Sequence, residues 1–226
     1  MEPSSRDGNS TSTDQAGAAV GDRRDDAFAL LGLAPLAALA ADQIEEAFRQ
    51  RATDCHPDAD GGGADGDRFA ALGAARERLL SVAGRLDELR RRHAGVGEAT
   101  AEGRRTVTLS AGLNRLFPVV GSALEGAREA IGRRDRAQSD LARALVTPAL
   151  LAARAGLIEA QQQVRATLAE MERALPGLDR ELAAGNDGDG GRRQRALGEL
   201  DALQGQFACL ERWHHQLRQQ TAACMF

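Results

Sequence analysis

Apolar residues recur every three or four positions over most of this 226-residue chain. An α-helix turns once every 3.6 residues, so positions with this spacing share one helix face. Leu and Ala, both strong helix formers, dominate the composition. The sequence therefore predicts an all-α fold, and its clearest repeat is a heptad seam formed by Val164, Leu168, Met171, Leu175, Leu178 and Leu182.

Composition divides the chain into four segments. Residues 1–24 are rich in Ser, Gly, Asp and Arg, cannot bury enough apolar surface to offset the entropy of ordering, and are predicted to be disordered. Residues 25–93 are predicted to form a small helical domain and residues 94–109 a linker. Residues 110–220 are predicted to form an antiparallel helical bundle or coiled coil.

The small domain is predicted to contain four helices. Asp25 or Asp26 caps a short first helix that ends at Gly32. The second begins at Asp42 with Glu45 as its capping-box partner, and the third begins at Asp67. The fourth covers residues 82–93. The predicted core consists of Phe28, Leu31, Leu33, Ile44, Ala47, Phe48, Ala52, Phe69, Leu72, Ala75, Leu79, Leu86 and Leu89.

Prolines and glycines divide the second half of the chain. Pro118 is predicted to kink or restart a helix, Thr147–Pro148 to begin one, and Pro176 to break one. Residues 185–191 are predicted to form a turn. The predicted inward face of the first of these helices comprises Leu113, Phe117, Val120, Leu124, Ala127 and Ile131. That of the last comprises Leu197, Leu200, Leu203, Phe207, Leu210, Trp213 and Leu217.

A His56-Pro57-Asp58 tripeptide separates the second and third predicted helices. Because proline disfavours α conformation in the residue before it, the second helix must end there. The order helix, HPD, glycine-rich loop, helix resembles the J-domain of DnaJ-type co-chaperones. Other residues that carry this resemblance are the segment 28–33 (FALLGL), Phe48, Phe69, Leu72, Ala75, Leu79 and Arg85.

The resemblance implies a protein that stimulates ATP hydrolysis by a DnaK-type chaperone. Asp58, Arg49 and Arg51 would dock on that ATPase, and His56 and Pro57 would shape the loop. The sequence also departs from the family pattern: Cys55, Ala59 and Arg76 replace the usual Tyr, basic residue and Tyr, and acidic residues dilute the basic second helix. These changes weaken the electrostatic docking that the resemblance implies.

A J-domain followed by an all-helical region is similar to the HscB family of iron–sulfur assembly co-chaperones. The 22 residues between Leu33 and His56 match the longer first connection of that family. This resemblance implies an iron–sulfur scaffold protein as client of the helical region. The alternative is a coiled-coil adaptor or structural protein with a degenerate J-like domain.

Other patterns favour ordinary interpretations. A catalytic His56/Asp58 pair is disfavoured, because residues on either side of a proline rarely face each other and no nucleophile lies nearby; we expect no enzymatic activity. Arg90–Arg92 are predicted to be a solvated helix end. His214 and His215, with Cys209 and Cys224, fit no zinc spacing, so no metal or other cofactor is expected, and Trp213 is predicted to be core.

Charge and hydropathy narrow the expected partners and compartment. The formal net charge of −4 disfavours binding to nucleic acid or to an anionic membrane. The N-terminus has no signal-peptide core, and no uninterrupted apolar run approaches about 20 residues, so a cytoplasmic protein is expected. The Val164–Leu182 seam is predicted to be covered within the chain, with a homodimer as the open alternative.

Overall fold

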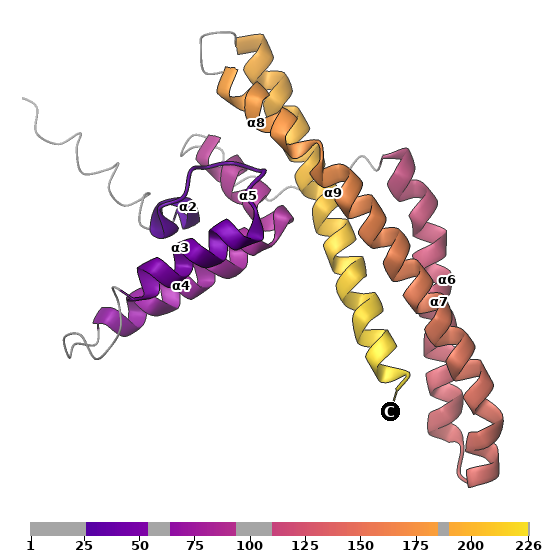
Figure 1. The fold of residues 1–226 in the computed structure, drawn as a ribbon. Coiled ribbons are helices and arrows are strands. Elements are labelled where there is room, and N and C mark those ends of the chain that lie inside the picture. The colour runs from indigo at the N-terminus through magenta and orange to yellow at the C-terminus, as the bar shows by residue number, and fades with distance from the viewer. Residues whose placement is uncertain (1–25, 54–63, 94–109, 185–189, 226) are drawn as a thin grey trace, which may run out of the picture.

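The computed structural model describes residues 26–53, 64–93, 110–184 and 190–225. All regular secondary structure in these residues is helical, so the predicted all-α class is confirmed. Figure 1 shows a small group of helices at one side of a long helical bundle. The predicted tail (1–24), the linker (94–109) and residues 185–189 of the predicted turn lie outside the described residues. The prediction of a turn was wrong for residues 190 and 191, which form the start of a helix.

The small group contains α2 (Ala27–Leu31), α3 (Ala41–Thr53), α4 (Ala64–Leu80) and α5 (Val82–His93). Asp26 caps α2 by accepting bonds from the backbone N–H groups of Phe28 and Ala29. Gly32 ends this helix with a φ of 69°, a left-handed conformation that glycine adopts without strain. Both ends of α2 therefore confirm the sequence prediction.

The start of α3 differs from the prediction. The helix begins at Ala41, and the carbonyl of Ala40 accepts the first helical bonds. The side chain of Gln43 accepts a bond from the Ala40 N–H at 3.0 Å, so Gln43 provides the reaching-back half of a capping box. Asp42 is therefore not the N-cap, and the Glu45 side chain pairs with Arg76 of α4 instead of capping the helix.

The long bundle contains α6 (Ala111–Arg136), α7 (Asp140–Glu172), α8 (Leu175–Ala184) and α9 (Gly190–Ala223). The prediction that a helix begins at Pro148 was wrong: α7 begins at Asp140 with Ser139 as its N-cap and passes through Pro148. Of the two alternatives for Pro118, a kink or a restart, the restart does not occur, because α6 runs from Ala111 to Arg136. Each of these helices packs along its length on a neighbour, which offsets the loss of one backbone bond. The predicted break at Pro176 is confirmed, since α7 ends at Glu172 and Pro176 lies in the first turn of α8.

Two apolar cores run through the molecule. The lower core joins α6, α7 and α9 through residues such as Leu124, Leu157 and Leu217. The upper core contains the predicted interior of α2–α5 and continues without a break into α8 and the first half of α9. Leu168 and Met171 of the heptad seam contact both cores. The seam is therefore covered within the chain, as predicted.

Two predicted core aromatics lie at the surface instead. Phe69 is 47% exposed, and its ring contacts Phe48 of α3. Phe117 is 61% exposed, because Leu116 occupies the inward position on α6, and the Phe117 ring lies edge-on to Trp213. Trp213 itself is buried, as predicted.

Candidate functional site

Helices α3 and α4 lie side by side in opposite directions. Near the start of α3, the Glu45 carboxylate accepts two bonds from the Arg76 guanidinium, at 2.6 and 2.8 Å, and Arg76 lies in the second half of α4. Further along α3, the Phe48 ring contacts Phe69 in the first half of α4, with 6.0 Å between ring centroids. Positions that rise along α3 thus meet positions that fall along α4, which makes the pair antiparallel (Figure 1).

The Glu45–Arg76 pair is the main polar link between these helices. The Arg76 guanidinium also lies 5.3 Å from the centroid of the Phe48 ring, in cation–π range. Hydrogen bonding to Arg76 lowers the pKa of Glu45, and the same bond raises the pKa of Arg76. In the sequence, Arg76 stood out only as a departure from the family pattern. Its pairing with Glu45 was not predicted, because the two residues are 31 positions apart and no local pattern connects them.

The HPD tripeptide itself, His56, Pro57 and Asp58, lies outside the described residues. The structure fixes the helix ends that flank it, Thr53 of α3 and Ala64 of α4. Because the two helices are antiparallel, these ends lie at the same end of the pair. The tripeptide therefore belongs to the connection that joins them.

Arg49 and Arg51, the predicted docking residues, lie in the last turns of α3 and are exposed. The Arg49 guanidinium forms an ion pair with Glu46 at 2.6 Å, one turn back on the same helix. The Arg51 guanidinium lies against Gly32, where a Cβ atom would come within 2.4 Å of it. The absence of a side chain at position 32 thus makes room for Arg51 beside the end of α2.

Helix α3 carries a small net negative charge. Its acidic residues are Asp42, Glu45 and Glu46 and its basic residues are Arg49 and Arg51, which gives 2 − 3 = −1. Glu45 is neutralised by Arg76 and Glu46 by Arg49. After these pairings, α3 presents one acidic group, Asp42, near its start and one basic group, Arg51, near its end.

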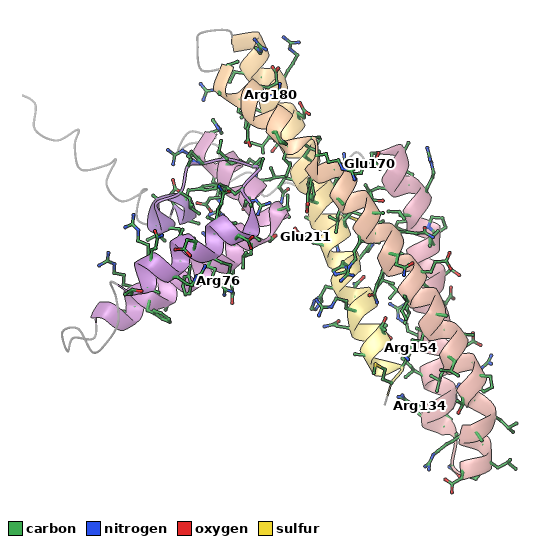
Figure 2. The ribbon with its side chains drawn as sticks, viewed as in Figure 1. Arg76, Arg134, Arg154, Glu170, Arg180 and Glu211 are labelled. Atoms are coloured by element: carbon green, nitrogen blue, oxygen red, sulfur yellow. The ribbon has the colours of Figure 1, made fainter. Side chains whose placement is uncertain are left out.

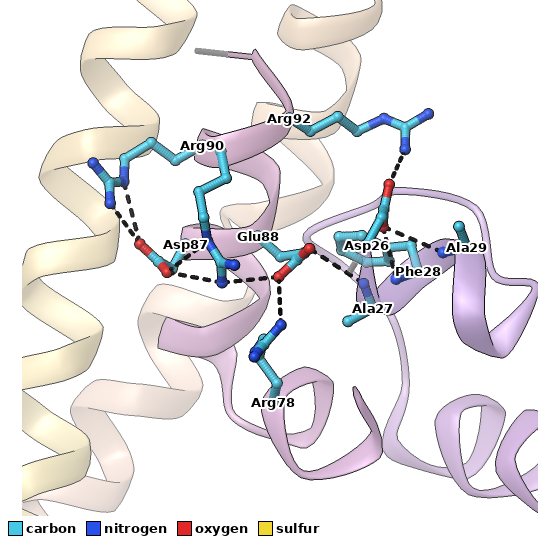
Figure 3. A network of polar contacts seen from close by, with 10 residues as sticks. Asp26, Ala27, Phe28, Ala29, Arg78, Asp87, Glu88, Arg90 and Arg92 are labelled. Carbon is cyan, nitrogen blue, oxygen red and sulfur yellow. Dashed lines mark hydrogen bonds and ion pairs between the residues drawn. The ribbon is translucent and has the colours of Figure 1, made fainter. Parts of the chain in front are cut away.

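A second polar cluster joins α2, α4 and α5 (Figure 3). The Glu88 side chain is nearly fully buried and accepts a bond from the Ala27 N–H at 3.2 Å. It also forms ion pairs with Arg78 at 3.3 Å and with Arg91 at 2.9 Å. A buried carboxylate with three donors is satisfied, and it ties the start of α2 to α5.

The three arginines at the end of α5 form ion pairs with acidic side chains of α5 itself and with Asp26. Arg90 pairs with Asp87 at 2.7 Å, and Arg91 pairs with both Asp87 and Glu88. Arg92 donates to Asp26, the residue that caps α2 (Figure 3). The prediction of a freely solvated helix end was therefore incomplete, because each of these arginines forms an ion pair.

A third polar cluster holds the small helical group against the bundle. Asp179 of α8 accepts bonds from the N–H groups of Ala37 and Ala38, at 2.7 and 3.0 Å. Glu211 of α9, labelled in Figure 2, accepts bonds from the Ser81 hydroxyl at 2.6 Å and the Ala83 N–H at 3.2 Å. These contacts join residues more than 120 positions apart, so the sequence offered no local signal for them.

Arg85 of α5 is the buried cation of this junction. It is 5% exposed and donates to the carbonyls of Ala37 and Leu79 at 3.1 and 2.8 Å. Burial lowers the pKa of Arg85, and the nearby Glu172, Glu211 and Asp179 oppose that shift. The Arg85 side chain therefore bridges the 33–40 loop and α4 to the acidic side of the bundle.

The histidines of α9 do not belong to a larger cluster of titratable side chains in the described residues. His214 is half-buried beside Trp213, its Nδ1 atom is buried without a partner, and His215 is exposed. Burial and the neighbouring Arg165 lower the pKa of His214. In the part of the chain that the structure describes, no group of three or more His, Cys, Asp or Glu side chains could hold a metal ion.

One stretch of the bundle has the length and composition of a membrane span, namely Asp140–Ala184, which covers α7 and α8. Little of its most apolar portion is fully buried, and this portion contains Arg143 and Arg154. Length and composition alone are weak grounds for a membrane location.

Comparison with known proteins gives no relative: no protein family, no curated protein and no solved structure matches this chain.

Proposed function

We propose that this protein is a co-chaperone that stimulates ATP hydrolysis by a DnaK-type chaperone through its HPD tripeptide. The observation that carries the proposal is the antiparallel α3–α4 pair, held by Glu45–Arg76 and Phe48–Phe69, with His56, Pro57 and Asp58 in its connection. Arg51 lies near the end of the pair formed by Thr53 and Ala64, the helix ends that flank the tripeptide in the sequence.

The proposed mechanism is electrostatic docking. Arg49, Arg51 and Asp58 would contact the ATPase, with His56 and Pro57 shaping the loop, and the contact would favour the hydrolysis-competent state of the chaperone. The helical bundle α6–α9 would carry the client, for which the resemblance to HscB proteins suggests an iron–sulfur scaffold. The tripeptide supplies no chemistry of its own in this mechanism, so the proposal describes a non-enzymatic, cytoplasmic protein without a cofactor.

The test is single-turnover ATP hydrolysis by the DnaK-type chaperone of the same organism, with and without the full chain. We expect the wild-type protein to accelerate hydrolysis and Asp58→Asn to abolish the acceleration. Arg49→Ala combined with Arg51→Ala should raise the concentration needed for half-maximal stimulation by about tenfold, the effect of losing roughly 1.4 kcal/mol of docking energy. The matched control is Arg115→Ala, at an exposed arginine of α6, which should stimulate like the wild type.

Equal stimulation by wild type and Asp58→Asn would disprove the role assigned to that carboxylate. A second candidate function, an adaptor protein with a degenerate J-like domain, is favoured by one observation: α3 has lost most of its positive surface to the Glu46–Arg49 pair and to its own acidic residues. Absence of any stimulation by the wild-type protein would support this second function.

A further inference from the structure

The first half of α7 carries an exposed apolar stripe. Its members are Leu141, Leu145, Pro148, Leu151, Ala155 and Ile158, all exposed and separated by three or four positions. Leu141 and Leu145 are 72% and 73% exposed, and Leu151 is 60% exposed. This spacing is the one with which helices pack on each other. The stripe contains no charge, since Arg143 and Arg154, the only charged residues between Leu141 and Ile158, fall outside its spacing.

The stripe lies on the side of α7 that the bundle does not use. Further along α7, the buried residues Leu157, Ala160 and Val164 face α6 and α9. Helix α9 ends at Ala223, whose carbonyl accepts a bond from Arg134 of α6 at 2.8 Å. Below that level the bundle consists of the α6–α7 hairpin alone, as the labelled positions of Arg134 and Arg154 show in Figure 2.

The neighbouring helix of the hairpin is an ordinary amphipathic helix. Outward positions of α6 carry charged side chains such as Glu125, Arg128 and Glu129. Of the two hairpin helices, α7 is the one that is apolar on its packed side and on its outer side alike. An isolated exposed leucine is common, but a continuous apolar stripe along a helix indicates an interaction surface.

The rest of this chain offers no cover for the stripe. The segments outside the described residues, 1–25, 54–63, 94–109 and 185–189, are composed mainly of Gly, Ala, Ser, Thr, Asp and Arg. Large apolar residues are scattered singly in them, and the helical repeat that could match the stripe is missing from their sequences. The occupant must therefore come from another molecule.

We propose that the α7 stripe is the surface through which a second copy of this chain docks, hairpin against hairpin. An uncharged stripe is complementary to itself, because two copies related by a twofold axis meet without opposing like charges. The product would be a four-helix bundle made of two α6–α7 hairpins, a common way for helices to bury apolar stripes. This inference does not depend on the co-chaperone proposal.

The size of the stripe is adequate for such a dimer. The 18 residues from Leu141 to Ile158 extend about 27 Å at 1.5 Å per residue, and a helix face is about 10 Å wide. Two such faces with their flanking α6 side chains would bury on the order of 1,000 Å² of accessible surface, the lower limit for a specific interface. The dimer should therefore dissociate in the micromolar range rather than be permanent.

A lipid surface fits the stripe less well than a second copy does. Helices that lie on membranes commonly carry Trp or Phe on their apolar face and basic residues along the border. The stripe contains only Leu, Ala, Pro and Ile, with no Trp or Phe, and the outer face of α6 mixes Glu125 and Glu129 with Arg128, so its border is not uniformly basic. Small and aliphatic residues instead permit close helix–helix packing.

The test measures the mass of the full-length protein by sedimentation equilibrium and by light scattering from about 1 to 200 µM, a range that covers the weak, reversible association common for small interfaces. We expect a concentration-dependent dimer in the wild type. Leu145→Glu combined with Leu151→Glu should raise the dissociation constant at least about 100-fold, because two carboxylates per copy would be buried without partners. The matched control is Leu36→Glu, at a leucine that is 41% exposed outside the stripe, and it should dimerise like the wild type.

Circular dichroism checks that the variants fold. Both alter exposed positions, so we expect both to retain the wild-type helix content. A wild-type protein that stays monomeric at 200 µM would overturn the proposal. So would a dimer that the stripe variant leaves intact. Binding of a monomeric wild type to phosphatidylglycerol vesicles, lost in the stripe variant, would overturn it in favour of a lipid surface.

Discussion

The two ends of the long bundle differ in whether their apolar helix faces are buried. At the upper end, α8 packs on α9, α9 packs on α5 of the small helical group, and all of them share one core, so that Leu175, Leu178 and Leu200 are buried. At the lower end, the leucines of α7 from Leu141 to Leu151 have a similar spacing and lie exposed. A periodic apolar face therefore predicts that a helix forms, but not what covers it.

Polar contacts distinguish the two ends as well. The upper end is closed by Asp179 and Glu211, which accept bonds from backbone N–H groups of the small helical group. Arg85 supplies the buried cation between them. At the lower end, the hairpin donates to α9 through two bonds, from Arg134 to the Ala223 carbonyl and from the Gln161 side chain to the Thr221 hydroxyl at 2.6 Å. Apolar contact brings helices together, and the buried polar partners at the upper end fix one docking geometry.

The largest effect is expected from shortening a leucine at the covered end. Leu200→Ala removes a side chain that is 0% exposed in the upper core. The lost burial and the cavity that remains should lower the free energy of unfolding by about 2–5 kcal/mol. Urea denaturation followed by circular dichroism measures this loss, and a change below about 1 kcal/mol would show that the small group does not pack firmly on α9.

A smaller loss is expected when the buried cation of the junction is removed. Arg85→Met keeps much of the side-chain volume but leaves the carbonyls of Ala37 and Leu79 without their donors. Leaving buried acceptors unpaired should cost about 2–3 kcal/mol. The control is Arg115→Met, at an exposed position, and the same denaturation measurement should show no loss for it.

Acidification should weaken the covered end by a smaller amount. Burial, together with Arg193 and Arg92, lowers the pKa of His93 below its ordinary value of 6.5. The unfolded chain therefore binds this proton more readily than the folded protein does, so stability is present above pH 6.5 and is lost as the pH falls through the lowered pKa.

Denaturation at pH 7.5 and 5.5 measures the pH effect. His93→Gln should show a smaller loss between these pH values than the wild type. The control is His215→Gln, at an exposed histidine of α9, which should retain the wild-type pH dependence. If His93→Gln retained the full pH dependence, the assignment of the effect to His93 would be wrong.

The smallest effect is expected at the exposed stripe. Leu151→Ala makes the same chemical change as Leu200→Ala, but at a side chain that is 60% exposed. At protein concentrations of a few micromolar or below, where the proposed dimer is largely dissociated, the free energy of unfolding should change by less than about 0.5 kcal/mol. A loss comparable to that of Leu200→Ala would mean that this face of α7 is covered within the monomer, and the contrast between the two ends would fail.

Much of the helical framework was predictable from local chemistry. The caps at Asp26 and Gly32, the bounds of α5 and the break before Pro176 all follow from the conformations those residues favour. Local chemistry misled at Pro148, where packing on a neighbouring helix outweighs the cost of proline. It also misplaced Phe69 and Phe117, which border an apolar face without entering the core.

The candidate site was predictable only in part. The sequence located His56, Pro57 and Asp58 between two amphipathic segments, and the antiparallel α3–α4 pair is compatible with that prediction. The tripeptide itself lies outside the described residues, so its role stays a prediction. The pairing of Arg49 with Glu46 and the place of Arg51 beside Gly32 depend on side-chain positions that residue order does not specify.

The sequence by itself determined which segments are helices and which face of each is apolar, because helix periodicity, caps and breakers act within a few residues. Only the tertiary structure decided that Asp179 and Glu211 accept hydrogen bonds from the small helical group, and that Leu141, Leu145 and Leu151 of α7 remain exposed. The physical reason is the range of the interactions. An apolar face can be buried by any matching face, and the choice among them rests on contacts between residues more than a hundred positions apart.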